Sequence, residues 1–142
     1  MIAIFDGEHA FLSNFFPSPF EVDGITFPSV EHWFQANKTT DPAEFKAIAA
    51  AQTPGKSKRM GRGCQLRPDW EEVKTDVMLN GLRHKFKIPE LRAKLLATGD
   101  EELVEGNTWH DCTWGRCVCD KCGGQGQNLL GQLLMELREE IR

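Results

Sequence analysis

The sequence predicts a mainly α-helical single domain, spanning residues 1–142, with a small β-hairpin near its N-terminus. Two observations predict this class. Most of the chain divides into segments that open with a helix-capping residue and carry apolar residues at helical spacing. One Asp-Gly pair lies between two short segments of strand-forming residues, which is a strong hairpin signal. A chain of 142 residues is long enough for one hydrophobic core and too short to predict two.

The hairpin is the clearest element in residues 1–27, which otherwise read as short strands and turns. Residues 20–22 and 25–27 flank Asp23-Gly24. A two-residue hairpin turn needs left-handed backbone, which glycine adopts freely and aspartate tolerates. The sequence therefore predicts two antiparallel strands joined at this pair.

Helices account for most of the remaining chain. Each begins at a residue that accepts hydrogen bonds from the first turn, or at a proline that fits that turn. The first three run from Ser29 to about Thr39, from Asp41 onward, and from Thr53 to near Gly61. In the second, Pro42 occupies the first helical position and Glu44 is expected to close a capping box. The last three run from Asp69 through Phe86, from Pro89 to Thr98, and from about Asn128 onward. The fourth carries a stripe of Val73, Val77, Met78, Leu82 and Phe86, and the last one of Leu129, Leu130, Leu133, Leu134, Leu137 and Ile141. Between Gly99 and Gln127 the pattern breaks down, which indicates a functional loop.

Composition and charge exclude several classes of protein. The net charge of −4 and the pI near 5.6 argue against a protein that coats duplex nucleic acid, but not against binding of a single nucleotide. No apolar run approaches the roughly 20 residues that cross a bilayer, and no leader-like segment opens the chain. Five cysteines, odd in number and mostly clustered late, do not suggest a secreted disulfide framework. We therefore expect a cytoplasmic monomer that does not bind membranes.

The most informative segment is the aromatic-rich stretch 11–38, which ends in a helix carrying an acid and an amine. Glu31, Gln35 and Lys38 form one row on this helix, because residues three and four apart are neighbours. The residues expected to pack inward are Trp33, Phe34 and Ala36. The row is either the wall of a pocket with proton-transfer groups or a solvent-exposed face with an ordinary ion pair. Spacing alone favours the exposed face.

A local basic run follows in residues 55–67, GKSKRMGRGCQLR. The run contains no acidic residue. Its five cationic residues are Lys56, Lys58, Arg59, Arg62 and Arg67. In an acidic protein this run predicts either a phosphate-binding segment, with arginines for bidentate contacts, or a solvated basic surface. Its glycines do not fit the phosphate-loop or dinucleotide fingerprints, so the sequence predicts no ATP or NAD fold.

Two tryptophans and an aspartate are further candidates for a site. Trp114 lies in the predicted loop and is suited to stacking on a nucleobase, which is typically worth roughly 1–3 kcal/mol. Trp70, beside a helix start, is a candidate of the same kind, although core packing is the better single interpretation. Asp111 either works with Glu31 as a second carboxylate or forms a turn.

The loop also contains a cysteine cluster. It comprises Cys112, Cys117, Cys119 and Cys122, in the spacing C-x4-C-x-C-x2-C. The piece that ends in Gly123 has the form of a zinc knuckle, but knuckles usually occur as two well separated pairs, and here His110 is only a spare ligand. A zinc site and reduced free thiols both stay open, and we prefer the thiols, so no metal and no cofactor are predicted. Cys64 is interpreted as a small packing residue.

A series of different short motifs occurs in a definite order along nearly the whole chain. They are Phe11-Leu12-Ser13-Asn14-Phe15, Pro28 to Ala36 with Lys38, Met60-Gly61-Arg62, Arg67-Pro68-Asp69-Trp70, Val77-Met78, Lys85-Phe86, Leu95 to Asp100, Leu103-Val104-Glu105, Trp114-Gly115, Asn128 to Gly131 and Leu134-Met135. In this order and spacing they resemble the NADAR family, also called YbiA-like proteins. The chain departs from the family pattern at Asn37, where glutamine is common, and in the cysteine-rich insert after Gly115.

The resemblance implies a mainly helical domain that hydrolyses bonds between ribose C1′ and nitrogen. By position it implies that Glu31 is the acidic catalytic residue. The family's lysine after the Gln-Ala pair corresponds to Lys38, and its carboxylate before the Trp-Gly pair corresponds to Asp111, which would assist. It also implies that the pocket tryptophans are Trp70 and Trp114.

Chemistry at C1′ suits these residue types. A carboxylate stabilises the oxocarbenium-like carbon that forms as an amine departs. If the ribose ring opens instead, C1′ becomes an electrophile that a lysine amine attacks. We hypothesise this second route, with Lys38 forming a Schiff base and Glu31 moving protons. Asn14 is expected to orient ribose hydroxyls, and Arg59 or Arg62 to hold phosphates.

Two substrate classes are associated with the family. One is ADP-ribose on the amino group of guanine in nucleic acid, and the other is phosphorylated early intermediates of riboflavin synthesis. Both present a ribose carbon bonded to an exocyclic amine beside phosphate, and we favour ADP-ribosyl guanine. The alternative of a different class is a non-catalytic module that binds ADP-ribose or a nucleotide and has a zinc-braced loop.

Overall fold

A computed structural model describes residues 1–142 and confirms the mainly helical class. The chain divides by its contacts into two compact units. The central unit is Asn14–Ile88, and the terminal unit combines Met1–Ser13 with Pro89–Arg142. That the two units behave as a single domain stays a prediction. None of the helices combines the length and the apolar composition that crossing a membrane requires.

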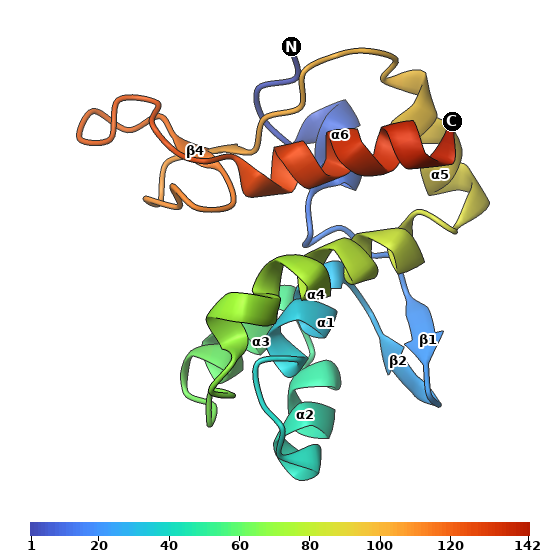
Figure 1. Ribbon diagram of the computed structural model, residues 1–142, viewed down its shortest axis with the longest axis vertical. Helices are drawn as coiled ribbons and strands as arrows, with labels where there is room; N and C mark the ends of the chain where they lie inside the picture. The colour runs from blue at the N-terminus through green and yellow to red at the C-terminus, as the bar shows by residue number, and fades with distance from the viewer. The chain divides into compact units, whose positions relative to one another are not determined.

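The central unit begins with the predicted hairpin. Strand β1 (Phe20–Val22) pairs antiparallel with β2 (Ile25–Phe27), as Figure 1 shows. Asp23 and Gly24 have φ values of 52° and 80°, which is the left-handed backbone that a two-residue turn requires. The hairpin therefore forms where the Asp-Gly signal predicted it.

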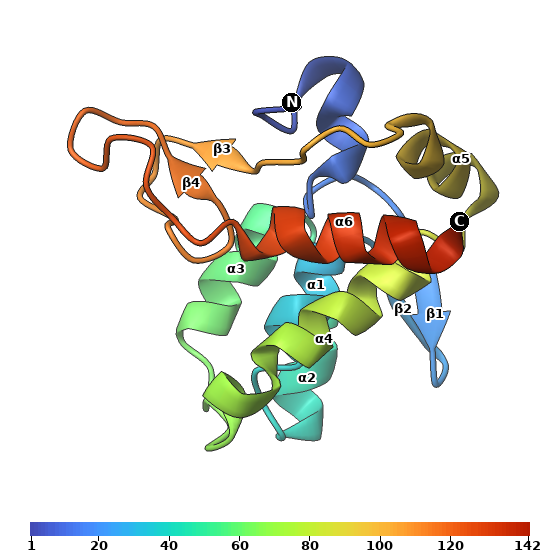
Figure 2. The ribbon, with the colours of Figure 1, turned by 45° about the horizontal axis from the view of Figure 1, so that its top comes forward.

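Four helices complete the central unit, and α1 lies among the other three (Figure 2). They are α1 (Val30–Ala36), α2 (Pro42–Ala49), α3 (Pro54–Arg62) and α4 (Trp70–Lys85). The caps predicted for the first three are confirmed, because Ser29, Asp41 and Thr53 each accept a backbone N–H of the first turn, at 3.3, 3.1 and 3.0 Å. Local sequence thus fixes where these helices begin.

Two predicted side-chain caps are wrong. Glu44 does not close a capping box on α2, because its Oε1 accepts the backbone N–H of Gln65 at 3.0 Å. The Asp69 side chain does not cap α4, because it pairs with the Arg67 guanidinium, at 2.6 Å from Nε and 3.0 Å from Nη2. A cation that offers two aligned donors outcompetes a single backbone N–H for the carboxylate of Asp69.

Gly81 marks a close approach of α4 to α1. A Cβ at this position would lie 2.6 Å from Cδ1 of Trp33 and 3.3 Å from Cγ1 of Val30. The indole cannot retreat freely, because its Nε1 donates to the carbonyl of Val77 at 2.9 Å. We expect Gly81→Ala to lower the free energy of unfolding, measured by urea titration, by about 2 kcal/mol, as overpacking of a core does.

Gly55→Ala is the matched control for this prediction. Gly55 also lies in a helix, but the nearest atom to an added Cβ is Oγ1 of Thr53 at 4.0 Å. Here we expect no loss of stability, and a gain of at most about 1 kcal/mol from the better helix propensity of alanine. Equal losses in both variants would show that the α1–α4 contact is not the cause.

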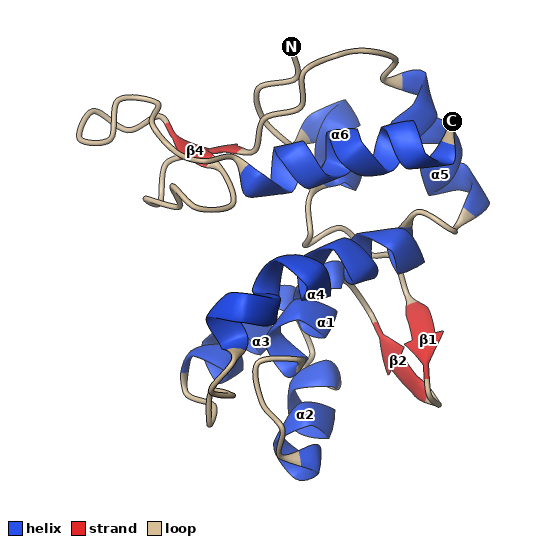
Figure 3. Cartoon of the chain, in the orientation of Figure 1, coloured by secondary structure: helices blue, strands red, loops and turns tan.

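The terminal unit is built from three helical segments and a minimal sheet. Its first segment, η1 (Gly7–Leu12), is a 3-10 helix where strands and turns were predicted, and α5 (Pro89–Ala97) and α6 (Leu129–Ile141) follow later in the chain. Strands β3 (Gly106–Asn107) and β4 (Arg116–Cys117) pair in parallel. Both strands lie within the segment 99–127 that was predicted to be loop throughout, whereas the part between β4 and α6 has no helix or strand (Figure 3).

Helix α6 begins where the sequence predicts but is held by a different interaction. Asn128 precedes the helix and its side chain does not cap it. Instead its Oδ1 accepts the N–H of Glu105 at 3.0 Å and its Nδ2 donates to the carbonyl of Leu103 at 2.9 Å. These two bonds attach the start of α6 to the segment before β3. The leucines of the α6 stripe that are buried are Leu130, Leu133, Leu134 and Leu137.

Candidate functional site

The acidic residue of the predicted row is buried. Glu31 lies in the first turn of α1 with 7% of its surface exposed, and Gln35, one turn later, has 3% exposed. Nε2 of Gln35 donates to Oε1 of Glu31 at 2.8 Å. The solvent-exposed interpretation of the row is therefore wrong for these two residues, and the interpretation as the wall of a pocket gains support.

Close packing of α3 on α1 explains the burial of Gln35. Gly61 of α3 faces Gln35, since a Cβ on Gly61 would lie 2.0 Å from Oε1 and 3.2 Å from Cβ of that side chain. Only glycine lets the two helices approach so closely around a glutamine. The spacing within α1 carries no information about this partner helix, so the sequence could not decide between the two interpretations.

Two residues that form hydrogen bonds with Glu31 each carry a buried side-chain acceptor that receives no hydrogen bond from the protein. These acceptors are Oε1 of Gln35 and Oδ1 of Asn14. Asn14 is 9% exposed, and its backbone carbonyl accepts the N–H of Glu31 at 3.1 Å. A buried acceptor without a donor costs about 1–3 kcal/mol, so such a pair suits a ligand that donates hydrogen bonds, as hydroxyl groups do.

The helix predicted to run to about Thr39 ends at Ala36, so the prediction that Lys38 continues the helical row of Glu31 and Gln35 is wrong. Lys38 lies in the turn after α1, where its N–H donates to the carbonyl of Gln35 at 3.2 Å. Its Nζ lies 5.6 Å from the ring centroid of Phe34 and 6.0 Å from that of Trp70. Burial lowers the pKa of the Lys38 amine below its usual value of 10.5, and the positive charges of Lys58 and Arg62 lower it further. The nearby Glu31 carboxylate opposes this shift without cancelling it. The neutral, nucleophilic form of this amine is therefore more accessible than that of a solvated lysine.

The basic run lies on α3 and the turn after it. Arg59 and Arg62 are exposed, as a phosphate-binding role requires. Lys58 is one turn before Arg62 on the same helix face, and both act electrostatically on Lys38. Lys58 is therefore a candidate that the sequence did not single out, whereas Arg67 is already paired with Asp69.

The predicted core packing of Trp70 is confirmed. The side chain is 6% exposed, and its ring meets Phe34 edge-on, with centroids 5.0 Å apart and an interplanar angle of 61°. Its role as a stacking partner for substrate stays a prediction. Cys64 is also a packing residue, set against the core around Phe27 and Ile48, and burial raises the pKa of its thiol. A raised pKa disfavours the thiolate that a nucleophile needs.

Asp111 and Trp114 belong to the terminal unit, so their meeting with Glu31 stays a prediction. Oδ1 of Asp111 accepts the backbone N–H groups of Thr113 and Trp114, at 3.1 and 2.9 Å. The Asn107 side chain exchanges two further hydrogen bonds with the Asp111 backbone, at 2.9 and 3.1 Å. The turn-forming interpretation of Asp111 is thereby confirmed, and its assistance in catalysis is untested.

Helix α4 contains a fully buried lysine that is not among the site residues predicted from the sequence. Lys85 has no exposed surface, and its Nζ lies 5.1 Å from the ring centroid of Phe86 and 5.9 Å from that of Phe16. Burial lowers the pKa of the Lys85 amine to about 7. A signal was present in the sequence, because position 85 continues the spacing of the buried Met78 and Leu82 on the apolar stripe.

Lys85 should make stability depend on pH. Its pKa is about 7 in the folded chain and near 10.5 when solvated, so between these values the unfolded chain holds a proton that the folded chain lacks. The free energy of unfolding therefore rises with pH across this window, and the full penalty applies below pH 7. We expect Lys85→Met to flatten the dependence of the free energy of unfolding on pH between about pH 7 and pH 10.

Urea titrations from pH 6 to pH 10 test this expectation. Lys87→Met, at an exposed position two residues along the chain, serves as the control and should keep the pH dependence of the parent protein. Parallel curves for the parent and Lys85→Met would contradict the assignment.

Comparison with known proteins supports the family suggested by the motifs. The model of the NADAR domain family matches residues 4–142. N-glycosidase YbiA of Escherichia coli is 47% identical over 132 residues, covering 91% of this chain and 79% of that protein. The solution structure of E. coli YbiA matches with a TM-score of 0.82 at 40% identity, covering 99% of this chain and 86% of that one.

A relative with a different name is also similar. A riboflavin biosynthesis protein of Vibrio vulnificus is 38% identical over 140 residues, which cover 96% of this chain but 37% of that protein. The mainly helical fold, the buried carboxylate and the named relatives together define a hydrolase of N-glycosyl bonds. The chain belongs to the NADAR family. The relatives named N-glycosidase favour the enzyme over the non-catalytic binding module.

Proposed function

We propose that this N-glycosidase cleaves the bond between ribose C1′ and an exocyclic nitrogen, releasing ADP-ribose from the amino group of guanine in nucleic acid. The observation that carries the proposal is the buried Glu31 carboxylate, flanked by two acceptors without protein donors and near an amine whose pKa is lowered. A ribose offers two hydroxyl donors to such acceptors. Asn14 then orients the sugar hydroxyls, Gln35 holds Glu31 in place through its 2.8 Å hydrogen bond, and Glu31 acts at the anomeric carbon.

The proposed reaction proceeds through an open ribose. Glu31, in its protonated form, gives its proton to the ring oxygen as the bond from that oxygen to C1′ breaks, which leaves C1′ doubly bonded to the substrate nitrogen. The neutral amine of Lys38 attacks C1′, Glu31 takes the extra proton from the lysine nitrogen, and it delivers this proton to the substrate amine as the amine leaves. Water then attacks the protonated imine on Lys38 and gives a proton back to Glu31, so that the sugar departs as an aldehyde and its ring closes. Lys38 and Glu31 both return to their starting states.

Phosphate recognition is assigned to α3. Arg59 and Arg62 are exposed, and Lys58 and Arg62 influence the charge state of Lys38, so these cations are near the proposed reacting amine. Guanidinium groups bind phosphate oxygens in pairs, which orients the substrate as well as attracting it. Trp114 is proposed to stack on the base, with Asp111 assisting.

Phosphorylated early intermediates of riboflavin synthesis are the second candidate substrate. The names of the Vibrio vulnificus relative and of a maize chloroplast riboflavin biosynthesis protein, 37% identical over 147 residues, support this candidate. These compounds also join a ribose carbon to an exocyclic amine beside phosphate. The same residues of the central unit would therefore act on either substrate.

Parallel incubations test the proposal. The purified protein is supplied with an ADP-ribosylated guanine oligonucleotide or with the riboflavin intermediates, and released ADP-ribose or ribose phosphate is quantified by chromatography. Release of ADP-ribose supports the first substrate, and release of ribose phosphate alone moves the assignment to the second. No release from either, by protein that binds both, contradicts the proposed substrates.

A further inference from the structure

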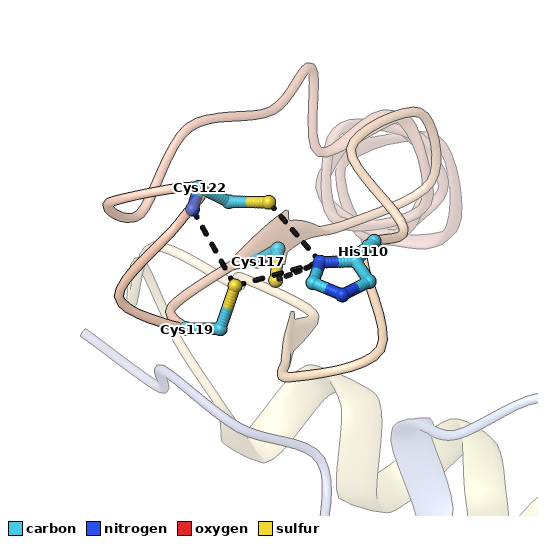
Figure 4. Close-up of side chains that lie close together, drawn as sticks. All are labelled: His110, Cys117, Cys119 and Cys122. Atoms are coloured by element: carbon cyan, nitrogen blue, oxygen red, sulfur yellow. Dashed lines mark hydrogen bonds between the residues drawn. The ribbon is translucent and has the colours of Figure 1, made fainter.

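Four side chains from the loop of the terminal unit converge on one point. They are His110, Cys117, Cys119 and Cys122, and their ligand atoms all lie within 4.8 Å of one another. Figure 4 shows three sulfur atoms directed at Nδ1 of the imidazole ring. Two of the thiols are half-buried and that of Cys117 is fully buried, so the cluster lies partly beneath the surface.

Hydrogen bonding does not account for this arrangement. Nδ1 of His110 lies 3.3 Å from Sγ of Cys122, 3.5 Å from that of Cys119 and 3.8 Å from that of Cys117. A ring nitrogen has either one hydrogen or one lone pair, so it forms one such bond and not three. Three sulfurs around one nitrogen are instead the pattern of four ligands around a common centre.

We propose that His110, Cys117, Cys119 and Cys122 bind one Zn²⁺ ion in a closed, tetrahedral structural site. Zinc bonds of about 2.3 Å to sulfur and about 2.0–2.1 Å to nitrogen, at tetrahedral angles, place each sulfur about 3.6 Å from the nitrogen. The three separations of 3.3, 3.5 and 3.8 Å bracket that value. Four protein ligands leave no open position, so the ion braces the loop and performs no chemistry on substrate.

The backbone around the cysteine pair has the geometry of a zinc knuckle. The N–H of Cys122 points at Sγ of Cys119 at 3.4 Å, which stabilises a thiolate. Gly123 and Gly124 follow with φ values of 64° and 81°, and their N–H groups bond the carbonyls of Cys119 and Cys117 at 2.9 and 2.7 Å. Glycine is needed at both positions because other residues rarely adopt this backbone.

The fourth ligand also adopts a costly conformation. His110 has φ of 68°, a left-handed backbone that a residue with a side chain adopts at a cost of about 1–3 kcal/mol. This conformation presents its Nδ1 to the three sulfurs. Cys112, which the sequence offered as a ligand, lies outside the cluster, and its carbonyl accepts the N–H of Gln127 at 2.7 Å. Sequence spacing could not show that histidine takes its place.

The site encloses the part of the loop that carries two candidate residues of the enzyme. Asp111 and Trp114 lie between His110 and Cys117 in the chain. A zinc ion that joins these two ends would restrict the intervening turn and so hold the two candidates in one conformation. The role of the metal is thus to order the loop.

Metal analysis of the purified chain tests the site. Protein produced with added zinc and purified without chelators should contain one zinc ion per chain, measured by inductively coupled plasma mass spectrometry. His110→Ala, Cys119→Ser and Cys122→Ser should each lower the content to near zero. Cys112→Ser and Cys64→Ser are the controls and should keep one zinc.

Cobalt substitution keeps the test decisive where a variant fails to fold. After removal of metal, the parent protein should take up one Co²⁺ with the strong visible absorption of a tetrahedral thiolate site, and added Zn²⁺ should abolish that absorption. If the metal-free parent protein develops no such absorption when Co²⁺ is added, the proposal is overturned. It is also overturned by an iron chromophore in place of zinc, or by a loss of zinc in Cys112→Ser equal to that in Cys119→Ser.

Discussion

Glu31→Gln is expected to lower kcat by about 100-fold to 10,000-fold and to leave the affinity for substrate nearly unchanged. The change replaces one carboxylate oxygen by an amide of the same size, and the remaining oxygen still accepts the 2.8 Å bond from Gln35. Packing around the site is therefore kept. What is lost is the negative charge and the proton that the carboxyl group carries, and C1′ chemistry depends on both.

Steady-state kinetics on the substrate identified by the parallel incubations measure this effect, with calorimetric binding as the second readout. Glu21→Gln, an exposed position on β1, is the matched control and should retain full activity. A fall in binding as large as the fall in kcat would instead indicate that Glu31 holds substrate. Retained activity would remove Glu31 from the mechanism.

Lys38 is expected to form a covalent adduct with substrate. Borohydride added during turnover should reduce the imine and increase the mass of the peptide that contains Lys38 by the mass of the attached sugar. The half-buried amine near Phe34 and Trp70 is the physical basis, because its lowered pKa makes the neutral form more available. Lys38→Met should abolish both the adduct and turnover.

The pH profile offers an independent readout for Lys38. A nucleophilic amine must lose its proton, so kcat should rise with pH through the lowered pKa of Lys38 and level off above it. Lys46→Met, on an exposed position of α2, is the control and should keep the adduct. If Lys38→Met is inactive but the parent protein yields no adduct, Lys38 acts through its charge and the Schiff-base route is excluded.

The two variants separate the parts of the proposed mechanism. Glu31→Gln removes proton transfer and retains Lys38, so slow accumulation of the reduced adduct is expected. Lys38→Met removes the covalent step and retains the buried carboxylate. Zinc loading concerns another segment of the chain, so the elemental analysis of the loop succeeds or fails independently of both results.

The sequence by itself determined the elements whose causes are local. The Asp23-Gly24 turn and the caps at Ser29, Asp41 and Thr53 form as predicted, because each depends on backbone and side-chain atoms a few residues apart. The order of the motifs likewise indicated the NADAR family, because it can be read from the sequence without knowledge of packing.

Only the tertiary structure decided which polar groups are buried and which ligands meet. Gln35 is enclosed because Gly61 of another helix admits close contact, and Asp69 binds Arg67 in place of capping its own helix. His110 displaces Cys112 from the cysteine cluster for the same reason. Burial and ligand geometry depend on neighbours distant in sequence, and the periodicity of a single segment carries no information about them.

Everything proposed for catalysis depends on a partly buried environment shared by one carboxylate and one amine of the central unit. Glu31 is 7% exposed, and burial is the largest cause of the lowered pKa of Lys38. The sequence placed the two residues on one predicted helix, whereas only the tertiary structure shows that Glu31 is buried and that Lys38 is half-buried in the turn after α1, because desolvation is a property of the assembled core and not of the segment.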